Sequence, residues 1–305
     1  MLKAWTLRLH RWLALTFALP LLIVFLTGLI LAFEPAIVAS TLKPNVVDAA
    51  QIEAALAKHD PEGTVERIFV HAPLGTLVLG DRGGPEIDLA TGEQANPPST
   101  SLAVYALARR IHKTLLLDGD WGVTISTIAM LFLVVIGLVM GIRPLRNTVS
   151  GWHTAAAWGT LPLILIAPLT GLAMVYKVTF SGPEPLVAAD AAPRSIMEAV
   201  RIVARERDLA TLLSLRLRKN GIEARLIEDG EYRNYAVSTA GLVDKPRNWP
   251  KLLHEGNWAG VWSASANAAT SLVLTLLLST GLLMWARRRL RRRRNSRDLA
   301  KLSRI

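Results

Sequence analysis

The 305-residue sequence contains no cysteine. This absence excludes disulfides, cysteine-ligated zinc, iron–sulfur clusters and thiol redox chemistry. Any metal ion must therefore be held by histidine, methionine, carboxylate or backbone groups. The sequence has six histidines that are available for that role.

Charged residues are missing from four long apolar stretches, which cover residues 12–33, 121–142, 155–176 and 263–286. About 20 apolar residues are enough for one helix to cross a bilayer. A buried helix of a soluble core is rarely this long and this free of charge. The first stretch also resembles a secretion signal, but the apolar core of a signal is only about 7–15 residues long. We therefore expect four retained transmembrane helices.

Apart from the apolar stretches and the two long loops, the chain has three short segments. Acidic residues are almost absent from these three segments. Residues 1–11, 143–152 and 287–305 hold 15 Lys and Arg against one acid, Asp298, whereas the two long loops hold 20 Lys and Arg against 23 acids. An excess of Lys and Arg marks the cytoplasmic side of a membrane. We expect both termini in the cytoplasm and both long loops outside. The basic run 287–294 fits an anchor that touches anionic lipid better than a nucleic-acid site, so no nucleic-acid partner is expected.

The two halves of the sequence resemble each other. His10 precedes a Leu-Thr-Gly-Leu stretch at 26–29, and His153 precedes the same stretch at 169–172, with 17 residues from His to Thr in both cases. The other two apolar stretches share a Gly-Leu-Xaa-Met sequence at 137–140 and 281–284, and they follow His112 and His254. The order of these features predicts a tandem repeat of residues 1–150 and 151–305.

Each long loop combines a helical pattern with alternating, strand-like runs. The first loop predicts a helix over 47–58, strands over 65–70, 76–79 and 86–89, and a short helix over 102–117 that meets the membrane. The second loop predicts a helix over 195–207 and strands over 212–218, 224–228 and 232–238. The expected fold is a four-transmembrane-helix bundle built from a tandem repeat, with two small α+β domains outside the membrane.

The predicted segments follow from these patterns. They are a cytoplasmic start with the first span (1–33), the first outer domain (34–120), the second span (121–142), a cytoplasmic loop (143–154), the third span (155–176), the second outer domain (177–262), the fourth span (263–286) and a basic cytoplasmic tail (287–305).

Four histidines fall into two pairs according to this topology. His10 and His153 lie near the cytoplasmic face, and His112 and His254 lie near the outer face. The apolar core of a bilayer is about 30 Å thick, so only the two histidines of one face can share an iron. Two imidazoles leave no open position on a haem iron, which suits electron transfer. The sequence predicts two haems with these four axial ligands, of b type because no cysteine can attach them. Interfacial histidines with solvated tips are the alternative.

Other residues are weaker candidates for the same sites. Glycines near the span ends, such as Gly137, could admit a haem plane or simply pack helices closely. Three methionines (Met140, Met174 and Met284) could bind iron, although methionine is more often a core residue. Three arginines (Arg8, Arg11 and Arg143) could meet haem propionates or simply obey the charge rule. His59 and His71 have no counterpart in the repeat, and we interpret both as surface residues. No catalytic side chain is predicted.

The chain resembles the membrane proteins with PepSY-associated transmembrane helices, which include iron-regulated membrane proteins. The likeness covers almost the whole chain and depends on the order of several motifs. They are Leu-His-Arg-Trp at 9–12, the two Leu-Thr-Gly-Leu stretches, Gly-Trp-His at 151–153, Leu-His-Glu-Gly at 253–256 and the Asp-Leu-Ala-Thr-Gly-Glu turn at 88–93. The resemblance implies PepSY-like outer domains, a bacterial inner-membrane location and, in some relatives, haem-dependent reduction of ferric siderophores in the periplasm.

The sequence departs from larger relatives that carry a cytoplasmic flavin reductase domain, because its tail has only 19 residues. A membrane quinol or a separate cytoplasmic reductase would have to donate the electrons. The expected function is therefore a two-haem oxidoreductase that carries electrons across the bilayer to a ferric siderophore. One alternative is a non-enzymatic membrane module whose outer domains bind a peptide, protease or transport partner. A siderophore transporter is disfavoured, because no charged residue lies in a span.

Overall fold

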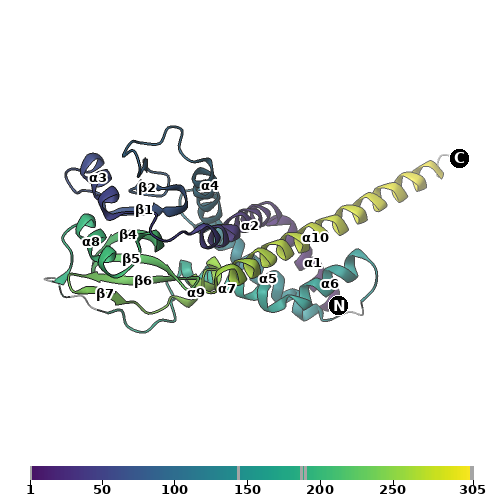
Figure 1. The fold of residues 1–305 in the computed structure, drawn as a ribbon. Helices are drawn as coiled ribbons and strands as arrows, with labels where there is room; N and C mark the ends of the chain where they lie inside the picture. Colours follow the sequence, from purple (N-terminus) through teal and green to yellow (C-terminus); the bar gives the residue numbers. More distant parts are fainter. Residues whose placement is uncertain (1, 143–144, 186–187, 189–190, 303–305) are drawn as a thin grey trace. The chain divides into compact units, whose positions relative to one another are not determined.

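The computed structural model describes residues 2–142, 145–185, 188 and 191–302. Arg143, one of the arginines suggested for haem propionates, lies outside the described residues. The described chain divides into two compact units. A helical unit comprises residues 1–29, 110–177 and 267–305, and a sheet unit comprises residues 30–109 and 178–266. Figure 1 shows both units.

The helical unit contains the apolar stretches. Its helices, two of which continue into the sheet unit, are α1 (Leu2–Thr16), α2 (Ala18–Thr41), α5 (Trp121–Met140), α6 (Val149–Gly159), α7 (Leu161–Val175) and α10 (Gly260–Leu302). Three segments are long and apolar enough to cross a membrane: Ala18–Val38, Trp121–Met140 and Gly260–Arg294. The helices α6 and α7 together meet the same criterion as a fourth, bent span. The length and composition of these segments thus agree with the four expected spans, but not every span is one straight helix.

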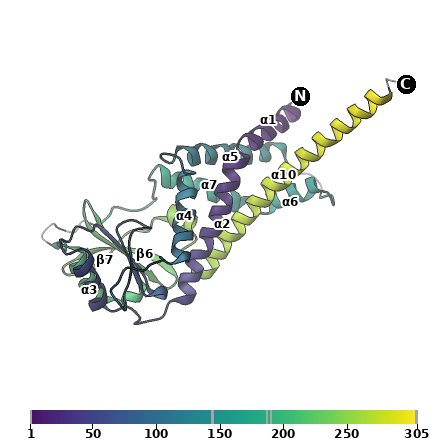
Figure 2. The ribbon, with the colours of Figure 1, turned by 90° about the horizontal axis from the view of Figure 1, so that it is seen from above.

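Two of the predicted spans are interrupted near a proline. The span predicted over 155–176 is divided at Thr160 between α6 and α7, which meet at a bend of 64°. The span predicted over 12–33 is divided at Phe17 between α1 and α2, and Figure 2 shows the two segments in succession. Proline has no N–H to donate to the carbonyl four residues earlier. Pro162 and Pro20 therefore cannot continue the helical hydrogen bonding there, and both breaks lie seven residues after a histidine, His153 and His10.

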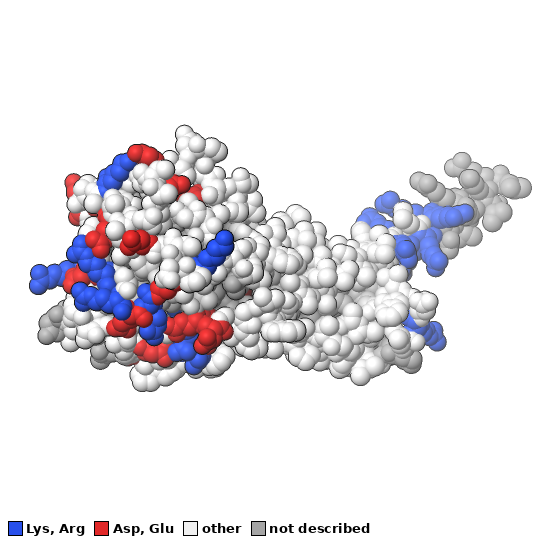
Figure 3. All heavy atoms as spheres, in the orientation of Figure 1, with Lys and Arg blue, Asp and Glu red and all other residues white. Residues whose placement is uncertain are grey.

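The surface of the helical unit is nearly free of charge over the apolar helices. Figure 3 shows this uncharged surface, and it shows Lys and Arg again along the far part of α10. Those residues are the exposed arginines of the 287–294 run. Large apolar side chains such as Phe132 and Val139 are more than half exposed. A soluble protein would bury them, so the exposed apolar side chains fit contact with lipid.

The sheet unit combines both long loops. Its helices and strands are α3 (Ala49–His59), β1 (Arg67–His71), β2 (Thr76–Leu79), β3 (Glu86–Asp88), α4 (Thr100–Thr114), α8 (Ile196–Glu206), β4 (Leu212–Arg218), β5 (Gly221–Glu228), β6 (Glu231–Ser238), β7 (Gly241–Asp244) and α9 (Trp249–Glu255). The predicted helices and strands of the loops are therefore confirmed. The sequence patterns did not reveal β7 and α9, which are only four and seven residues long.

The seven strands form one antiparallel sheet in the order β3-β2-β1-β4-β5-β6-β7. The strands of the first loop join those of the second through β1 and β4, where Ile68 is opposite Leu215. The prediction of two small outer domains is thereby corrected to one domain with two halves. The reason is physical: β1 and β4 would each be an unpaired edge in a separate domain, and their pairing removes both edges.

One face of the sheet carries the core of this unit. Helices α3 and α8 cover that face, as Figures 1 and 2 show, and apolar side chains fill the space between. In β5, Ile222, Ala224 and Leu226 are buried in this core. Side chains alternate along a strand, so Glu223 and Arg225 point to the opposite face. The capping box at Asp48 begins α3, and the Ser195 side chain caps α8. These caps fix where α3 and α8 begin, and both helices cover the core face of the sheet. The opposite face of the sheet remains polar.

Candidate functional site

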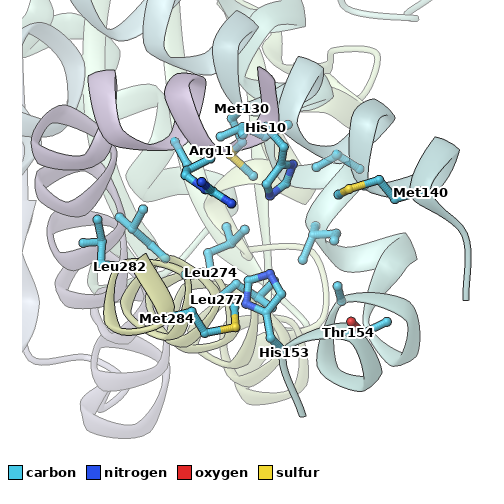
Figure 4. Close-up of a pocket in the computed structure, with 18 of the residues that line it drawn as sticks. His10, Arg11, Met130, Met140, His153, Thr154, Leu274, Leu277, Leu282 and Met284 are labelled. Carbon is cyan, nitrogen blue, oxygen red and sulfur yellow. The ribbon is translucent and has the colours of Figure 1, made fainter. Parts of the chain in front are cut away.

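A cavity of about 260 Å³ lies within the helical unit. Its walls are mostly apolar and come from α1, α2, α5, α6, α7 and α10. The polar side chains on its lining include His10, His153, Arg11 and Arg288. Figure 4 shows His10 and His153 pointing into this cavity from opposite sides, one from α1 and one from α6. The structure thus brings together the two histidines that were predicted to pair at the cytoplasmic face.

His153 is held in place from two directions. The Thr148 side chain caps the start of α6, which places His153 in the second turn of that helix. The Nδ1 atom of His153 lies 2.8 Å from Oγ1 of Thr280 in α10. The Thr280 hydroxyl donates its own hydrogen to the Leu276 carbonyl at 2.7 Å. The Thr280 oxygen is therefore left to accept, so Nδ1 of His153 carries the hydrogen and Nε2 keeps its lone pair.

His10 has a different environment on the opposite wall. It is half-buried on α1, and its Nδ1 atom is inaccessible to solvent without any hydrogen-bond partner among the described residues. A buried polar atom without a partner is costly, and in native proteins it calls for a specific reason. The Leu133 backbone on α5 also interacts with this imidazole.

His112 contacts the first Leu-Thr-Gly-Leu stretch. Its Nδ1 atom lies 3.0 Å from the Val24 carbonyl oxygen and 3.1 Å from Oγ1 of Thr27. A carbonyl can only accept a hydrogen bond, so Nδ1 of His112 carries the hydrogen. Gly28 makes room for the ring, because a Cβ atom there would lie only 3.2 Å from Cε1 of His112. In both His112 and His153, Nδ1 is therefore the nitrogen that carries the hydrogen.

His254 belongs to the sheet unit. It lies in the last turn of α9, which begins at the Asn248 cap and ends at Gly256 in the left-handed conformation, with φ +65. The predicted pairing of His254 with His112 stays a prediction.

Several secondary candidates line the same cavity as His10 and His153. Met140 and Met284 do so, and Figure 4 shows their sulfur atoms beside the histidines. Met174 is 37% exposed and is not on this lining. Arg11 lies on the lining and Arg8 does not. Of the suggested arginines in the described chain, Arg11 is therefore the one that lines the cavity, and its role toward propionates stays a prediction.

Sequence reasoning missed three residues of this site: Thr280, Arg288 and Met130. Arg288 was hidden in the basic run, where every arginine looked alike. Thr280 had a usable signal, because a Thr-Gly pair also occurs at 27–28 and 170–171. Gly137 lines the cavity, and a Cβ atom there would meet nothing within 4 Å.

The two remaining histidines are less exposed than predicted. Both are half-buried rather than surface residues. Nε2 of His59 lies 2.9 Å from the Gly92 carbonyl oxygen, so this histidine joins α3 to a turn. Burial, with a contribution from the charge of Arg82, lowers the pKa of His71 to about 4. The prediction for these two positions is therefore corrected: both side chains pack partly into the sheet unit.

The polar face of the sheet holds a network of ion pairs. Arg225 contacts Glu255 at 2.7 Å, and Arg109 pairs with Glu34. Burial opposes ionisation of Glu255, but the charges of Arg225 and Lys251 outweigh it and lower the pKa of this carboxyl well below its usual range. The charge of Arg225 also lowers the pKa of Lys251 to about 8. The ionisation of each of these groups therefore depends on the others.

The donor set of the cavity suits haem better than a bare ion. The described residues contain no group of three or more His, Asp or Glu side chains that could hold a metal ion. Two facing imidazoles are too few for a bare ion, but they are the complete protein contribution to a six-coordinate haem iron. The apolar walls suit a porphyrin, and Arg11 and Arg288 could face its carboxylates.

Comparison with known families agrees with the fold. Residues 7–288 match the family described as the PepSY-associated TM region. The chain belongs to this family. The resemblance stated from the motifs is thereby confirmed, and this PepSY-associated protein is a multi-pass membrane protein. A search of curated proteins found no match to the chain.

Proposed function

We propose that this PepSY-associated protein binds a b-type haem between His10 and His153 and carries electrons across the membrane. The observation that supports the proposal is the position of these two imidazoles on opposite walls of one apolar cavity. A bound haem supplies reversible one-electron exchange between ferric and ferrous iron, and two histidine ligands leave no open position for oxygen.

The residues of the cavity have separate tasks in this proposal. His10 and His153 bind the iron, and Thr280 orients His153 so that its unprotonated nitrogen is available. Leucines of α5 and α10 exclude water from the space between the histidines. Arg11 and Arg288 bind carboxylates of the ligand. Charge-assisted hydrogen bonds of this kind are roughly twice as strong as neutral ones.

We extend the proposal to a second haem with His112 and His254 as ligands near the outer face. The repeated histidines and Thr-Gly pairs support a tandem duplication. Such a duplication would give one haem site near each face of the bundle. The sheet unit would lie in the periplasm of a bacterial inner-membrane protein, with both termini in the cytoplasm, as the basic segments favour. A membrane quinol or separate reductase would donate electrons.

The proposed acceptor is a ferric siderophore on the periplasmic side. This part of the proposal comes from the resemblance to siderophore reductases. Hard oxygen ligands hold Fe(II) less tightly than Fe(III), so reduction would release the iron. The competing function is a module whose sheet unit binds a protein partner, for example by strand addition at the exposed edge strand β7.

The test is a pyridine haemochrome assay of the protein purified in detergent. We expect two b-type haems in the wild-type chain and the loss of one haem in His10→Ala and in His153→Ala. His59→Ala is the matched control, because that imidazole lies in the sheet unit and bonds to Gly92. Its haem content should equal that of wild type. Purified protein that carries no haem, or histidine variants with unchanged spectra, would contradict the proposal and favour the partner-binding module.

A further inference from the structure

We infer that Thr280 is a positioning residue that sets the electronic character of His153, and that Thr27 acts in the same way on His112. The inference rests on the proposed function, because it assigns these hydroxyls a role toward haem ligands. Both threonines accept a hydrogen bond from an imidazole Nδ1 atom, at 2.8 Å for Thr280 and 3.1 Å for Thr27.

The direction of each hydrogen bond follows from the helix that carries the threonine. Each hydroxyl donates to a carbonyl four residues earlier in its own helix. Thr280 donates to Leu276 and Thr27 to Ile23, both at 2.7 Å. The only hydrogen of the hydroxyl is used there, so its oxygen can act toward the imidazole only as an acceptor.

A glycine follows each threonine and lies near the imidazole ring. Gly28 follows Thr27 and Gly281 follows Thr280. The carbon atom Cε1 of the imidazole lies 3.2 Å from the position of a Cβ atom at Gly28 and 3.9 Å from that at Gly281. Each Thr-Gly pair thus contacts a histidine of another segment, and the threonine oxygen accepts from its Nδ1 atom. The missing Cβ atom is needed for space at Gly28, whereas 3.9 Å at Gly281 would be an ordinary contact.

His10 lacks such a Thr-Gly pair among the described residues. The glycine of α5 that lines the cavity, Gly137, follows Ile136 instead of a threonine. The Nδ1 atom of His10 correspondingly has no hydrogen-bond partner among the described residues. The two histidines of this cavity therefore differ in their partners: His153 donates to a hydroxyl oxygen, whereas the His10 imidazole interacts with the Leu133 backbone instead.

Polarisation has a predictable effect on a bound iron. An imidazole that donates its Nδ1 hydrogen becomes the more basic ligand at Nε2, and outer hydrogen bonds of this kind tune the metal. A more basic ligand favours the ferric state, which carries the higher charge. Loss of the Thr280 hydroxyl should therefore shift the reduction equilibrium toward ferrous iron.

The experiment compares Thr280→Val with Thr280→Ser in the full-length protein reconstituted with iron protoporphyrin IX. Valine keeps the branched shape but removes the acceptor, whereas serine retains it. We expect Thr280→Val to keep its haem content and to shift one of the two redox components about tenfold toward the reduced state, which is about 59 mV for one electron. Thr280→Ser should restore the wild-type potential. Thr27→Val should shift the other component less, because Nδ1 of His112 also lies 3.0 Å from the Val24 carbonyl oxygen, which stays in place.

Thr275→Val is the matched control on the same helix, because among the described residues the Thr275 hydroxyl bonds only to the Ser271 carbonyl, and Thr275 is not on the cavity lining. Its potentials should equal those of wild type. The low-spin ferric electron paramagnetic resonance signal should change in Thr280→Val and not in Thr275→Val. If Thr280→Val does not fold, Thr280→Ala is measured in its place.

The possible failures are distinguishable. A Thr280→Val protein with full haem content and unchanged potentials overturns the inference while the proposed function stands. A wild-type protein without haem overturns the proposed function itself. A shift of the potential in Thr275→Val as large as in Thr280→Val would show a general effect of the helix and would also overturn the role of Thr280.

Discussion

At the scale of single residues, Lys251 is a half-buried cation of the sheet unit whose charge is disfavoured by its surroundings. Arg225 is the main cause of its lowered pKa of about 8, Glu255 acts in the opposite direction, and burial adds to the lowering. The ordinary pKa of a lysine is about 10.4, so the unfolded chain binds the proton more tightly than the folded one. The charged form of Lys251 therefore destabilises the folded protein near neutral pH.

The pH dependence of stability should reveal this lysine. Between about pH 8 and pH 10 the unfolded state holds more protons, so the free energy of unfolding should rise with pH in that window. Lys251→Met should raise the free energy of unfolding at pH 7 by about 2 kcal/mol, following about 1.4 kcal/mol per pK unit and partial screening. Thermal unfolding followed by tryptophan fluorescence measures both effects.

Lys58→Met is the control for this measurement, because the Lys58 side chain is 47% exposed and pairs with Glu93 at the surface. Such a pair contributes about 0–1 kcal/mol, so the variant should show the same pH profile as wild type. A Lys251→Met protein that is less stable than wild type at pH 7 would contradict the assignment.

Single residues of the site also differ in how well they could be predicted from the sequence. His10 and His153 could be predicted because they stand at equivalent places in a repeat. Thr280 could not be assigned to His153, because the two are 127 residues apart and no periodicity links them. The orientation of an imidazole depends on which neighbouring helix presents an acceptor, and only packing decides that.

At the scale of helices and strands, the junction between β1 and β4 determines how the sheet unit behaves. Ile68 of β1 is fully buried and is paired with Leu215 of β4. The two halves of the sheet thus share a hydrogen-bonded boundary and one apolar core. The two halves of the sheet should therefore fold and unfold together.

Ile68→Ala tests this coupling. Removal of a buried isoleucine side chain typically costs about 2–5 kcal/mol. We expect hydrogen exchange to become faster in β2 and β5 alike, although only β2 belongs to the same half as Ile68. Leu217→Ala in β4 is the control, because this side chain is 46% exposed and its loss should cost less than about 0.5 kcal/mol. Faster exchange confined to β2 would mean that the halves are independent domains.

The sequence predicted most helices and strands of this unit but not their union. Amphipathic periodicity is local, so α3, α8 and the alternating strands were visible in it. Pairing between β1 and β4 joins residues such as Phe69 and Ser214, which are far apart in the chain. The breaks at Phe17 and Thr160 were also missed, because hydropathy alone treats a bent span and a straight one alike.

At the scale of the whole molecule, the absence of cysteine makes the proposed topology directly measurable. A single cysteine introduced at any exposed site is the only thiol of the chain. Glu62 is exposed in the sheet unit and Arg291 is exposed in the basic part of α10. In intact spheroplasts, a membrane-impermeant maleimide should label Glu62→Cys at once and Arg291→Cys only after the membrane is permeabilised.

The cysteine-free wild-type chain is the control and should remain unlabelled. Labelling of both variants in intact spheroplasts, or of Arg291→Cys alone, would contradict a periplasmic sheet unit with cytoplasmic termini. The measurement is independent of haem, so it tests the membrane orientation even if the proposed cofactor is wrong.

The composition of the cavity wall also constrains when this protein can mature. The wall includes Leu7 near the start of the chain and Arg288 near its end. A growing chain emerges from the ribosome with its N-terminus first, so the cavity has no closed wall until α10 has been synthesised and inserted. Any ligand of His10 that needs the complete cavity is therefore bound only after α10 is in place, and a chain that is cut before α10 lacks Thr280 and the α10 part of the cavity wall.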